Sequence, residues 1–311
     1  MIKKWVLKAV VQKVISFLPQ SHKINYLFQK YITRGVYLSD DYFYDRLAHA
    51  GEHIKAWQQG SGTSAPPSSL EIGTGWYPVV PISFFLSGVE AIYSVDISPL
   101  TSKPHLLTTI RKFMEAGEPR LAQVLPLVPE RWQELKTIAA SMNTQSLDDL
   151  LKQLHITYLV ADARQLPLDD NSIHLVNSNN TFEHIYPKLL QPILQEFQRV
   201  VKKENGVFSH AIDMSDHFAH FDKTISIYHF LRYSENAWKW IDNSVQPQNR
   251  CRMCDYEAMY QALNIPISSS THRKGDVNEL VKVPLAAPFK NYSPEANAIS
   301  HCHLVSFFRK N

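Results

Sequence analysis

Short apolar runs recur along most of the chain, and each ends in glycine or in a polar residue. The first is SLEIG at 69–73, and AIYSVDIS follows at 91–98. Segments with helical patterns separate the runs, and this alternation predicts β–α–β units that pack as a parallel sheet with helices on both faces. We therefore expect an α/β, doubly wound, mostly parallel sheet. Further strands are expected at 155–160, 172–178, 206–212 and 302–310, and helices at 79–86, 102–115 and 187–202.

Three parts of the chain depart from this alternation. Residues 1–59 have helical patterns, and the GSGTSAPPSS stretch that follows has the composition of a linker, placed at 60–67. Residues from about 116 to 154 add two or three helices between the second and third strands. We expect a helical extension, a linker, and an α/β domain over 68–311 with a helical insertion.

The composition excludes some classes of protein. Of the 311 residues, 44% are hydrophobic and 20% charged, which is typical of a folded globular protein. A net charge of +3 gives no support to a nucleic-acid partner. The three cysteines, Cys251, Cys254 and Cys302, cannot form a disulfide framework. Their odd number favours a reducing compartment, so we expect a cytoplasmic location.

The first 18 residues, MIKKWVLKAVVQKVISFL, are amphipathic. Val6, Val10 and Val14 recur at helical spacing, and lysines stand between them. Such a helix can lie on a membrane surface or pack on the body of the protein, and both interpretations remain open. No apolar run approaches the roughly 20 residues that a transmembrane helix needs.

The residues after each strand are the candidates for a ligand site, because doubly wound sheets bind ligands beyond the carboxyl ends of their strands. Glu71, Gly73 and Gly75 follow the first strand, where glycines let the backbone approach a ligand. Asp96 ends the second strand, and an acid there can accept both hydroxyls of a ribose. Asp162 follows the third, where an acid and a backbone N–H can bind an adenine edge.

Four segments together resemble the class I S-adenosylmethionine-dependent methyltransferases, specifically the small-molecule group with a type-11-like core. They are LEIGTG (70–75), YSVDIS (93–98), VADARQLPLDD (160–170) and NSNNTFEHI (177–185). The resemblance covers roughly residues 68–311. It implies a seven-stranded Rossmann-like methyltransferase fold, methyl transfer as the activity, and S-adenosyl-L-methionine as the cofactor.

The resemblance also implies roles for single residues. The Gly73–Gly75 loop would pass under the methionine part of the cofactor, and Glu71 would help to place its amino group. Tyr77 departs from the family pattern, because it occupies the place of the third glycine. The residues expected to bind the cofactor are Glu71, Gly73, Gly75, Asp96, Ile97, Asp162, Ala163 and Asn179.

Two other classes of function remain open. A nicotinamide-dependent oxidoreductase could have the same strands and acids, but its phosphate loop needs a small residue where this chain has Pro78. A non-catalytic binding protein could retain the cofactor fold. Within the methyltransferases, Ser178–Phe182 lacks the Asn/Asp-Pro-Pro-aromatic motif of enzymes that methylate DNA bases or glutamine.

The segment SHAIDMSDHFAHFD (209–222) begins at the carboxyl end of the fifth strand and is rich in His and Asp. Because histidine suits proton transfer near neutral pH, we predict His217 as the base and Asp213 as its orienting acid. The resemblance places His184 at the border of the reaction pocket. We predict an oxygen acceptor on a small molecule or a saccharide, and no metal. A purely structural loop and a metal site are the alternatives for this segment.

Acceptor contacts are expected from histidines of the same segment and from the Trp- and Arg-containing segment 238–265. Aromatic and arginine side chains can line a pocket for a sugar or an anion, although ordinary helix packing explains them equally well. His301 and His303 are expected to face one side of the last strand without special function. The oligomeric state is left open. The residues assigned to the acceptor are His210, His220, Trp240, Arg250 and Arg252.

Overall fold

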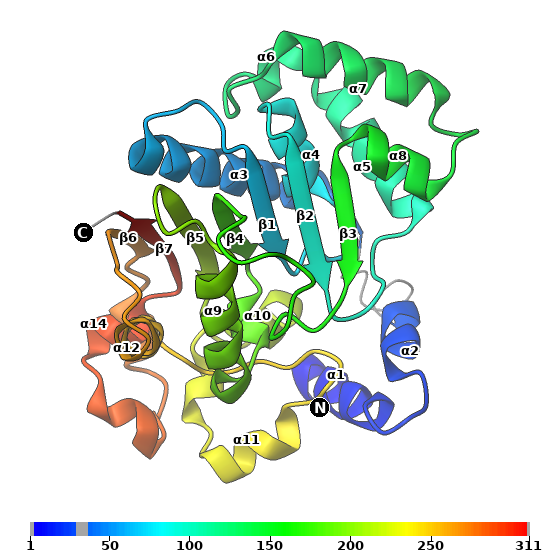
Figure 1. The fold of residues 1–311 in the computed structure, drawn as a ribbon. Coiled ribbons are helices and arrows are strands. Elements are labelled where there is room, and N and C mark those ends of the chain that lie inside the picture. Colours follow the sequence, from blue (N-terminus) through cyan, green and yellow to red (C-terminus); the bar gives the residue numbers. More distant parts are fainter. Residues whose placement is uncertain (1–2, 29–36, 310–311) are drawn as a thin grey trace.

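The computed structural model describes residues 3–28 and 37–309, and a seven-stranded sheet forms its centre (Figure 1). The strand order is β3-β2-β1-β4-β5-β7-β6, and only β7 runs antiparallel to its neighbours. The α/β, doubly wound, mostly parallel sheet predicted from the sequence is thus confirmed. The strands are β1 (Ser68–Ile72), β2 (Ala91–Asp96), β3 (Ile156–Val160), β4 (Leu175–Asn179), β5 (Gly206–Asp213), β6 (Ser269–Arg273) and β7 (His301–Phe308).

The strand β6 is absent from the sequence-based prediction. Its residues, SSTHR, are all exposed, so they form no apolar run that could mark a strand. It pairs only with β7, at the edge of the sheet.

Helices cover both faces of the sheet, because neighbouring strand residues point to opposite sides. Val207 packs in a buried cluster with α3 (Asp40–Ser61), α4 (Val79–Leu86) and α5 (Lys103–Ala116). The next residue, Phe208, packs in a second cluster with α9 (Pro187–Val200) and α12 (Met253–Ala262). The remaining helices are α1 (Lys4–Ile15), α2 (Ser21–Phe28), α6 (Glu118–Leu121), α7 (Pro129–Ser141), α8 (Leu147–Gln153), α10 (His217–Phe221), α11 (Glu235–Ile241), α13 (Val277–Leu280) and α14 (Pro294–Ala298).

The helix α3 is part of the main core, although it falls in the predicted extension. Ser39 caps its N-terminus by accepting a hydrogen bond from the backbone N–H of Tyr42, and Gly62 ends it with a φ of 74°. Its buried face packs on β4, β5 and α4. Residues 1–2 and 29–36 of the predicted extension lie outside the described residues. The predicted insertion consists of α6, α7 and α8, which pack beside α4, α5 and β3.

The helix α1 lies at the end of the sheet to which the arrows of β1, β2 and β3 point (Figure 1). It packs on α10 and α11, so it belongs to the same edge as the carboxyl ends of the parallel strands. In the described part of the chain, no helix has both the length and the apolar character needed to cross a membrane.

A chain of buried hydrogen bonds attaches α3 to the sheet. His53 Nε2 donates to Asn179 Oδ1 (2.9 Å), and His53 Nδ1 accepts from Ser209 Oγ (2.7 Å). Asn179 in turn donates to Glu71 (2.9 Å), while Ser209 accepts from His303 Nε2 (2.7 Å). An amide oxygen can only accept, so the tautomer of His53 and the direction of the whole chain are fixed.

Replacing His53 by Leu should lower the free energy of unfolding by about 2–4 kcal/mol, because Asn179 and Ser209 would each lose a buried partner. Urea denaturation followed by circular dichroism measures this change. Glu52→Ala, on the exposed side of the same helix, should stay within about 0.5 kcal/mol of the wild type. Equal midpoints for His53→Leu and wild type would show that the chain does not stabilise the fold.

Candidate functional site

The loop after β1 has the backbone of a ligand-binding turn. Gly73 has a φ of 77°, and a Cβ atom there would lie 2.4 Å from Thr181 Oγ1. Gly75 has a φ of 74°, and no atom of the described residues, its chain neighbours aside, lies within 4 Å of the place where its Cβ would be. Glycine is thus required at 73 by close approach, whereas at 75 the loop borders free space.

Asp96 lies opposite this loop, at the end of β2. Its carboxylate accepts hydrogen bonds from the Gly75 N–H (3.2 Å) and from the Tyr158 hydroxyl (3.0 Å). Burial raises the pKa of Asp96 to about 8, although both hydrogen bonds act in the opposite direction. Ile97, the next residue, is 73% exposed. A carboxylate held in this way beside a glycine loop can accept hydrogen bonds from the hydroxyls of a ligand.

Glu71 is a buried residue of β1, which lies between β2 and β4 in the sheet. Its two carboxylate oxygens accept from Thr74 Oγ1 (2.8 Å) and Asn179 Nδ2 (2.9 Å). Burial raises its pKa to about 7, while those hydrogen bonds and the charge of Arg46 lower it. The predicted pair Glu71 and Asn179 therefore meets in one hydrogen bond.

Three buried groups near Glu71 have polar atoms without a hydrogen-bond partner among the described residues. They are Arg46 Nη1 and His49 Nδ1 on α3, and both carboxylate oxygens of Glu183. Burial raises the pKa of Glu183 well above its usual range, and the charge of Arg46 lowers it. Unpaired buried polar atoms are costly, so this set points to a missing ligand.

An amino-acid group carries one carboxylate and one ammonium, which match an arginine and a glutamate. Together with the free space at Gly75, these residues fit the methionine part of S-adenosyl-L-methionine. The sequence analysis did not include Arg46 and His49. The signal was present, because both interrupt the apolar face of a helix that also buries Phe43, Leu47 and His53.

The remaining residues that were predicted to bind the cofactor are Asp162 and Ala163. Asp162 follows β3, and its half-exposed carboxylate is bound by Arg164 Nε at 3.0 Å, which lowers the pKa of Asp162. Ala163 is buried beside it.

Tyr77, at the place of the third glycine, packs its ring against His105 with 5.1 Å between the ring centroids. Its side chain thus contributes to packing at the start of α4.

Asp213, at the end of β5, faces three histidines. Its Oδ2 lies 3.5 Å from His217 Nε2 and 3.7 Å from His220 Nε2, and its Oδ1 lies 3.4 Å from His301 Nε2. Burial raises the pKa of Asp213, but the hydrogen bond to His217 and the charges of His217 and His301 outweigh it and leave the pKa below its usual range. The predicted His217–Asp213 contact is present, and His301, for which no special function was expected, also faces Asp213.

His184 lies next to His217, with 4.8 Å between the ring centroids. Its Nδ1 donates to the carbonyl oxygen of Pro247 (2.6 Å), so Nε2 is left with a free lone pair. Burial and the charge of His217 lower its pKa to about 4, which keeps His184 neutral at pH 7. Glu183, His184 and His217 each offer a ligand atom within 4.8 Å of the others, so these three could hold a divalent cation.

The residues assigned to the acceptor are dispersed. His210 is fully buried, and its ring stacks on Phe182. Arg252 is also buried and donates to backbone carbonyls of Met214 and Asn297. Trp240 is 81% exposed. His220 faces Asp213, whereas the other three have environments of packing or surface residues, and Arg252 reaches only the backbone next to Asp213.

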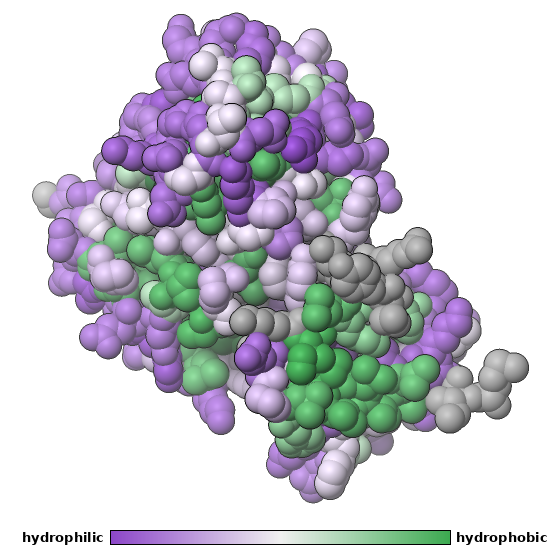
Figure 2. All heavy atoms as spheres, turned by 90° about the vertical axis from the view of Figure 1, so that its right-hand side faces the viewer, coloured by the Kyte–Doolittle hydropathy of each residue, from purple (hydrophilic) through white to green (hydrophobic). Residues whose placement is uncertain are grey.

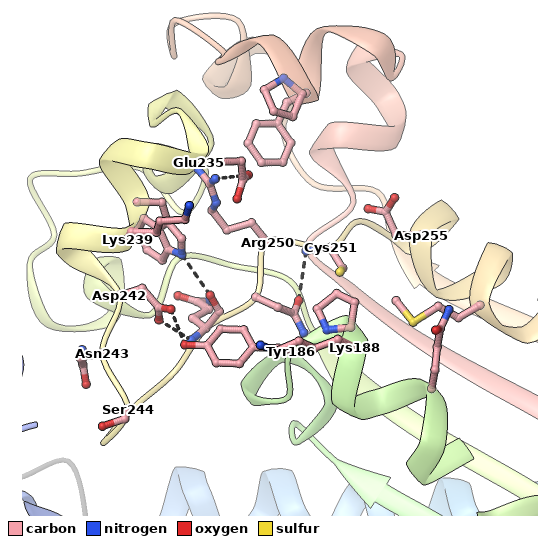
Figure 3. A pocket seen from close by; sticks show the side chains of 18 of the residues that line it. Tyr186, Lys188, Glu235, Lys239, Asp242, Asn243, Ser244, Arg250, Cys251 and Asp255 are labelled. Carbon is pink, nitrogen blue, oxygen red and sulfur yellow. Dashed lines mark hydrogen bonds and ion pairs between the residues drawn. The ribbon is translucent and has the colours of Figure 1, made fainter. Parts of the chain in front are cut away.

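Arg250 belongs to a separate cavity of about 1010 Å³ between α9, α11 and α12 (Figure 3). Its guanidinium binds Glu235, and Tyr186 on the opposite side donates to Asp242. The segment after Pro247 forms a wall of this cavity and hydrogen-bonds to the Glu183–His184 turn. A second cavity, of about 430 Å³, lies at the sheet edge between α3 and β7. It is lined by His49, Asn180 and His301, among others, and so adjoins the Asp213 cluster.

A sequence profile described as a methyltransferase domain matches residues 130–209, which include β3, β4 and the Glu183–His184 turn. The seven-stranded sheet, with β7 reversed between β5 and β6, is the Rossmann-like sheet of the class I methyltransferase fold.

Several solved structures are similar to this chain at low sequence identity. The geranyl diphosphate C-methyltransferase of Streptomyces coelicolor is 11% identical over 82% of this chain and 74% of its own, with a TM-score of 0.43. The phosphoethanolamine N-methyltransferase 2 of Haemonchus contortus is 10% identical over 83% of this chain and 52% of its own, with a TM-score of 0.45. YcgJ of Bacillus subtilis is 13% identical over 85% of this chain and 99% of its own, with a TM-score of 0.41. No curated protein matches the chain by sequence.

The raised pKa of Asp96 predicts a specific dependence of stability on pH in this methyltransferase fold. The folded value, about 8, lies above the ordinary 3.8, so the folded protein retains a proton that the unfolded chain has released. Stability from this group is complete at low pH and is lost as the pH rises through 8. Asp96→Asn should remove the loss, and should be more stable than wild type at pH 9 by on the order of 1 kcal/mol.

Urea denaturation at pH 6 and pH 9 measures the difference. Asp162→Asn is the matched control, because the pKa of Asp162 is lowered and its ionisation is complete across this range. A pH dependence of Asp96→Asn equal to that of wild type would contradict the assignment of a raised pKa to Asp96.

Proposed function

We propose that this protein is an S-adenosyl-L-methionine-dependent methyltransferase acting on an oxygen of a small molecule or a saccharide. The observation that carries the cofactor assignment is the Asp96 carboxylate, buried against the Gly75 loop at the end of β2. The observation that carries the oxygen acceptor is the contact between His217 and Asp213. The cytoplasm is the proposed location, since Cys251, Cys254 and Cys302 are free thiols.

Binding of the cofactor would involve residues of β1 and α3 together with residues at the ends of β2 and β3. Asp96 would accept the ribose hydroxyls, while Glu71 and Arg46 would bind the amino and carboxylate groups of the methionine part. Asp162 and the Ala163 N–H would face the adenine. When bound, the cofactor supplies an electrophilic methyl group on a sulfonium, and the rate depends chiefly on how the protein positions the acceptor.

The acceptor would enter the cavity lined by His49, Asn180 and His301, which adjoins Asp213. His217 would accept the proton of the acceptor hydroxyl as its oxygen takes the methyl group that the bound cofactor would supply. Asp213, whose lowered pKa keeps it ionised, then stabilises the imidazolium. His184 stays neutral and positions the ring of His217 by edge contact.

A thermal-shift panel tests the cofactor. S-adenosylmethionine and S-adenosylhomocysteine should raise the melting temperature because they bind the folded state, whereas NAD and NADP should leave it unchanged. Asp96→Ala should abolish the shift, and Asp162→Ala should reduce it less, because its side chain is already paired with Arg164. A shift with NAD or NADP alone would replace the proposal by an oxidoreductase.

Replacing His217 by Gln should lower turnover by about a hundredfold, which is the usual contribution of a general base. Release of S-adenosylhomocysteine across a panel of hydroxylated small molecules and saccharides measures turnover, and calorimetry with the same product should give an unchanged affinity. Asp213→Asn should act in the same direction, whereas His220→Gln should have a smaller effect because His220 is half-exposed. Cofactor binding without turnover on any acceptor would favour a non-catalytic binding protein.

Metal removal separates the two chemical roles available to His217. With a general base, turnover should survive EDTA. Turnover that disappears with EDTA and returns with added Zn²⁺ or Mn²⁺ would instead make Glu183, His184 and His217 metal ligands.

A further inference from the structure

A contiguous apolar surface covers the outer side of α1 and the turn after it. Leu7, Val10 and Val14 are 54–61% exposed, and Phe17 and Leu18 are 78% and 43% exposed. Figure 2 shows this surface as one green area at the bottom of the face that lies on the right in Figure 1. We call these five residues the α1 apolar face. Leu27 of α2, 50% exposed, adds a sixth apolar side chain nearby.

The opposite side of α1 is fixed to the body of the protein, so the apolar face cannot turn inward. Trp5 packs its ring against His229 at 4.8 Å, and its backbone N–H donates to Asp222. Gln12 donates to Gln246 (2.7 Å), and Lys13 Nζ donates to the carbonyl oxygens of Lys239 and Asp242. One side of the helix thus has its partners within the chain, whereas the α1 apolar face is largely exposed, and Lys13 Nζ lies over the ring of Phe17 at 5.9 Å from its centroid.

The sequence that carries this face is basic. Residues 3–18 contain four Lys and no Asp or Glu, although Lys13 is turned to the body of the protein. Lys3 and Lys4 are exposed at the start of α1, beside Leu7. Two copies of the protein meeting through this face would bring like charges together, which disfavours a dimer contact. An apolar face with a lysine border instead matches an anionic lipid surface, where the apolar side chains enter the headgroup region and the lysines meet the phosphates.

We propose that the α1 apolar face docks the protein on the surface of an anionic lipid bilayer. The helix lies in the plane of the bilayer and does not cross it. Since α1 packs on α10 and α11, this docking turns the carboxyl edge of the sheet, with the Asp213 cluster, towards the lipid. The proposal concerns binding alone and stands whether or not the protein transfers methyl groups.

Co-sedimentation of the full chain with vesicles tests this proposal without cofactor or acceptor. The protein should bind vesicles that contain phosphatidylglycerol, and should bind those of phosphatidylcholine alone at least about tenfold more weakly. The double variant Val10→Glu/Val14→Glu should lose at least about tenfold in affinity for the anionic vesicles. Lys3→Glu/Lys4→Glu should weaken binding too, and high salt should reduce the wild-type affinity.

The control is Val281→Glu, at a valine that is 67% exposed at the end of α13 and outside the α1 apolar face. It should bind as wild type does. Far-UV circular dichroism and the melting temperature verify that each variant is folded. Failure of the wild type to sediment with anionic vesicles would overturn the proposal, and so would equal binding by a folded Val10→Glu/Val14→Glu variant. A dimer in light scattering that this double variant dissociates would identify a second copy as the occupant, which also overturns it.

Discussion

The candidate site depends on the one-way hydrogen-bond chain that runs from His303 through Ser209, His53 and Asn179 to Glu71. Each member donates towards Glu71, so the chain ends on a group that must accept. Burial lowers the pKa of His303 to about 4 and that of His53 well below its usual range, so both rings stay neutral at pH 7. The chain joins α3 and four strands, and it holds Glu71, just before the Gly75 loop, in the interior despite the cost of burying a carboxylate.

The acidic side chains at this sheet edge differ in their environments, and the environments separate their roles. Burial raises the pKa values of Glu71 and Asp96 into the range from about 7 to about 8. Asp213 is also buried, but the hydrogen bond to His217 and the charges of His217 and His301 keep its pKa low. A carboxyl group with a raised pKa suits hydrogen bonding to a ligand, whereas a permanently ionised one suits stabilising a positive imidazole.

The sequence was sufficient to predict most of the sheet, because the apolar runs of the central strands are bounded by glycine and acids. It was insufficient for β6, since SSTHR is exposed throughout and has no apolar pattern. The residues after the parallel strands were predictable for the same topological reason. His301 was not, because β7 returns antiparallel, so its approach to Asp213 depends on packing between distant segments. Arg46 interrupts the apolar face of α3, which is a signal, but its place beside the strands depends on how α3 packs on the sheet.

The residues assigned to the acceptor show a second limit of prediction from the sequence. Arg250 and Arg252 are separated by a single residue, and the sequence alone cannot tell which of the two guanidinium groups lines a cavity. In the fold, Arg250 lines one, whereas Arg252 is bound by backbone carbonyls in the interior. A buried arginine of this kind connects the loops whose carbonyl oxygens it binds.

The contacts of Trp5 give the N-terminal helix a second importance. Its ring lies against Phe218, the residue directly after His217, and its backbone N–H binds Asp222 at the other end of α10. Trp5 therefore contacts both ends of the short helix that begins with His217. Removing Trp5 would remove both contacts from the helix that begins with His217, even though Trp5 and His217 lie more than two hundred residues apart in sequence.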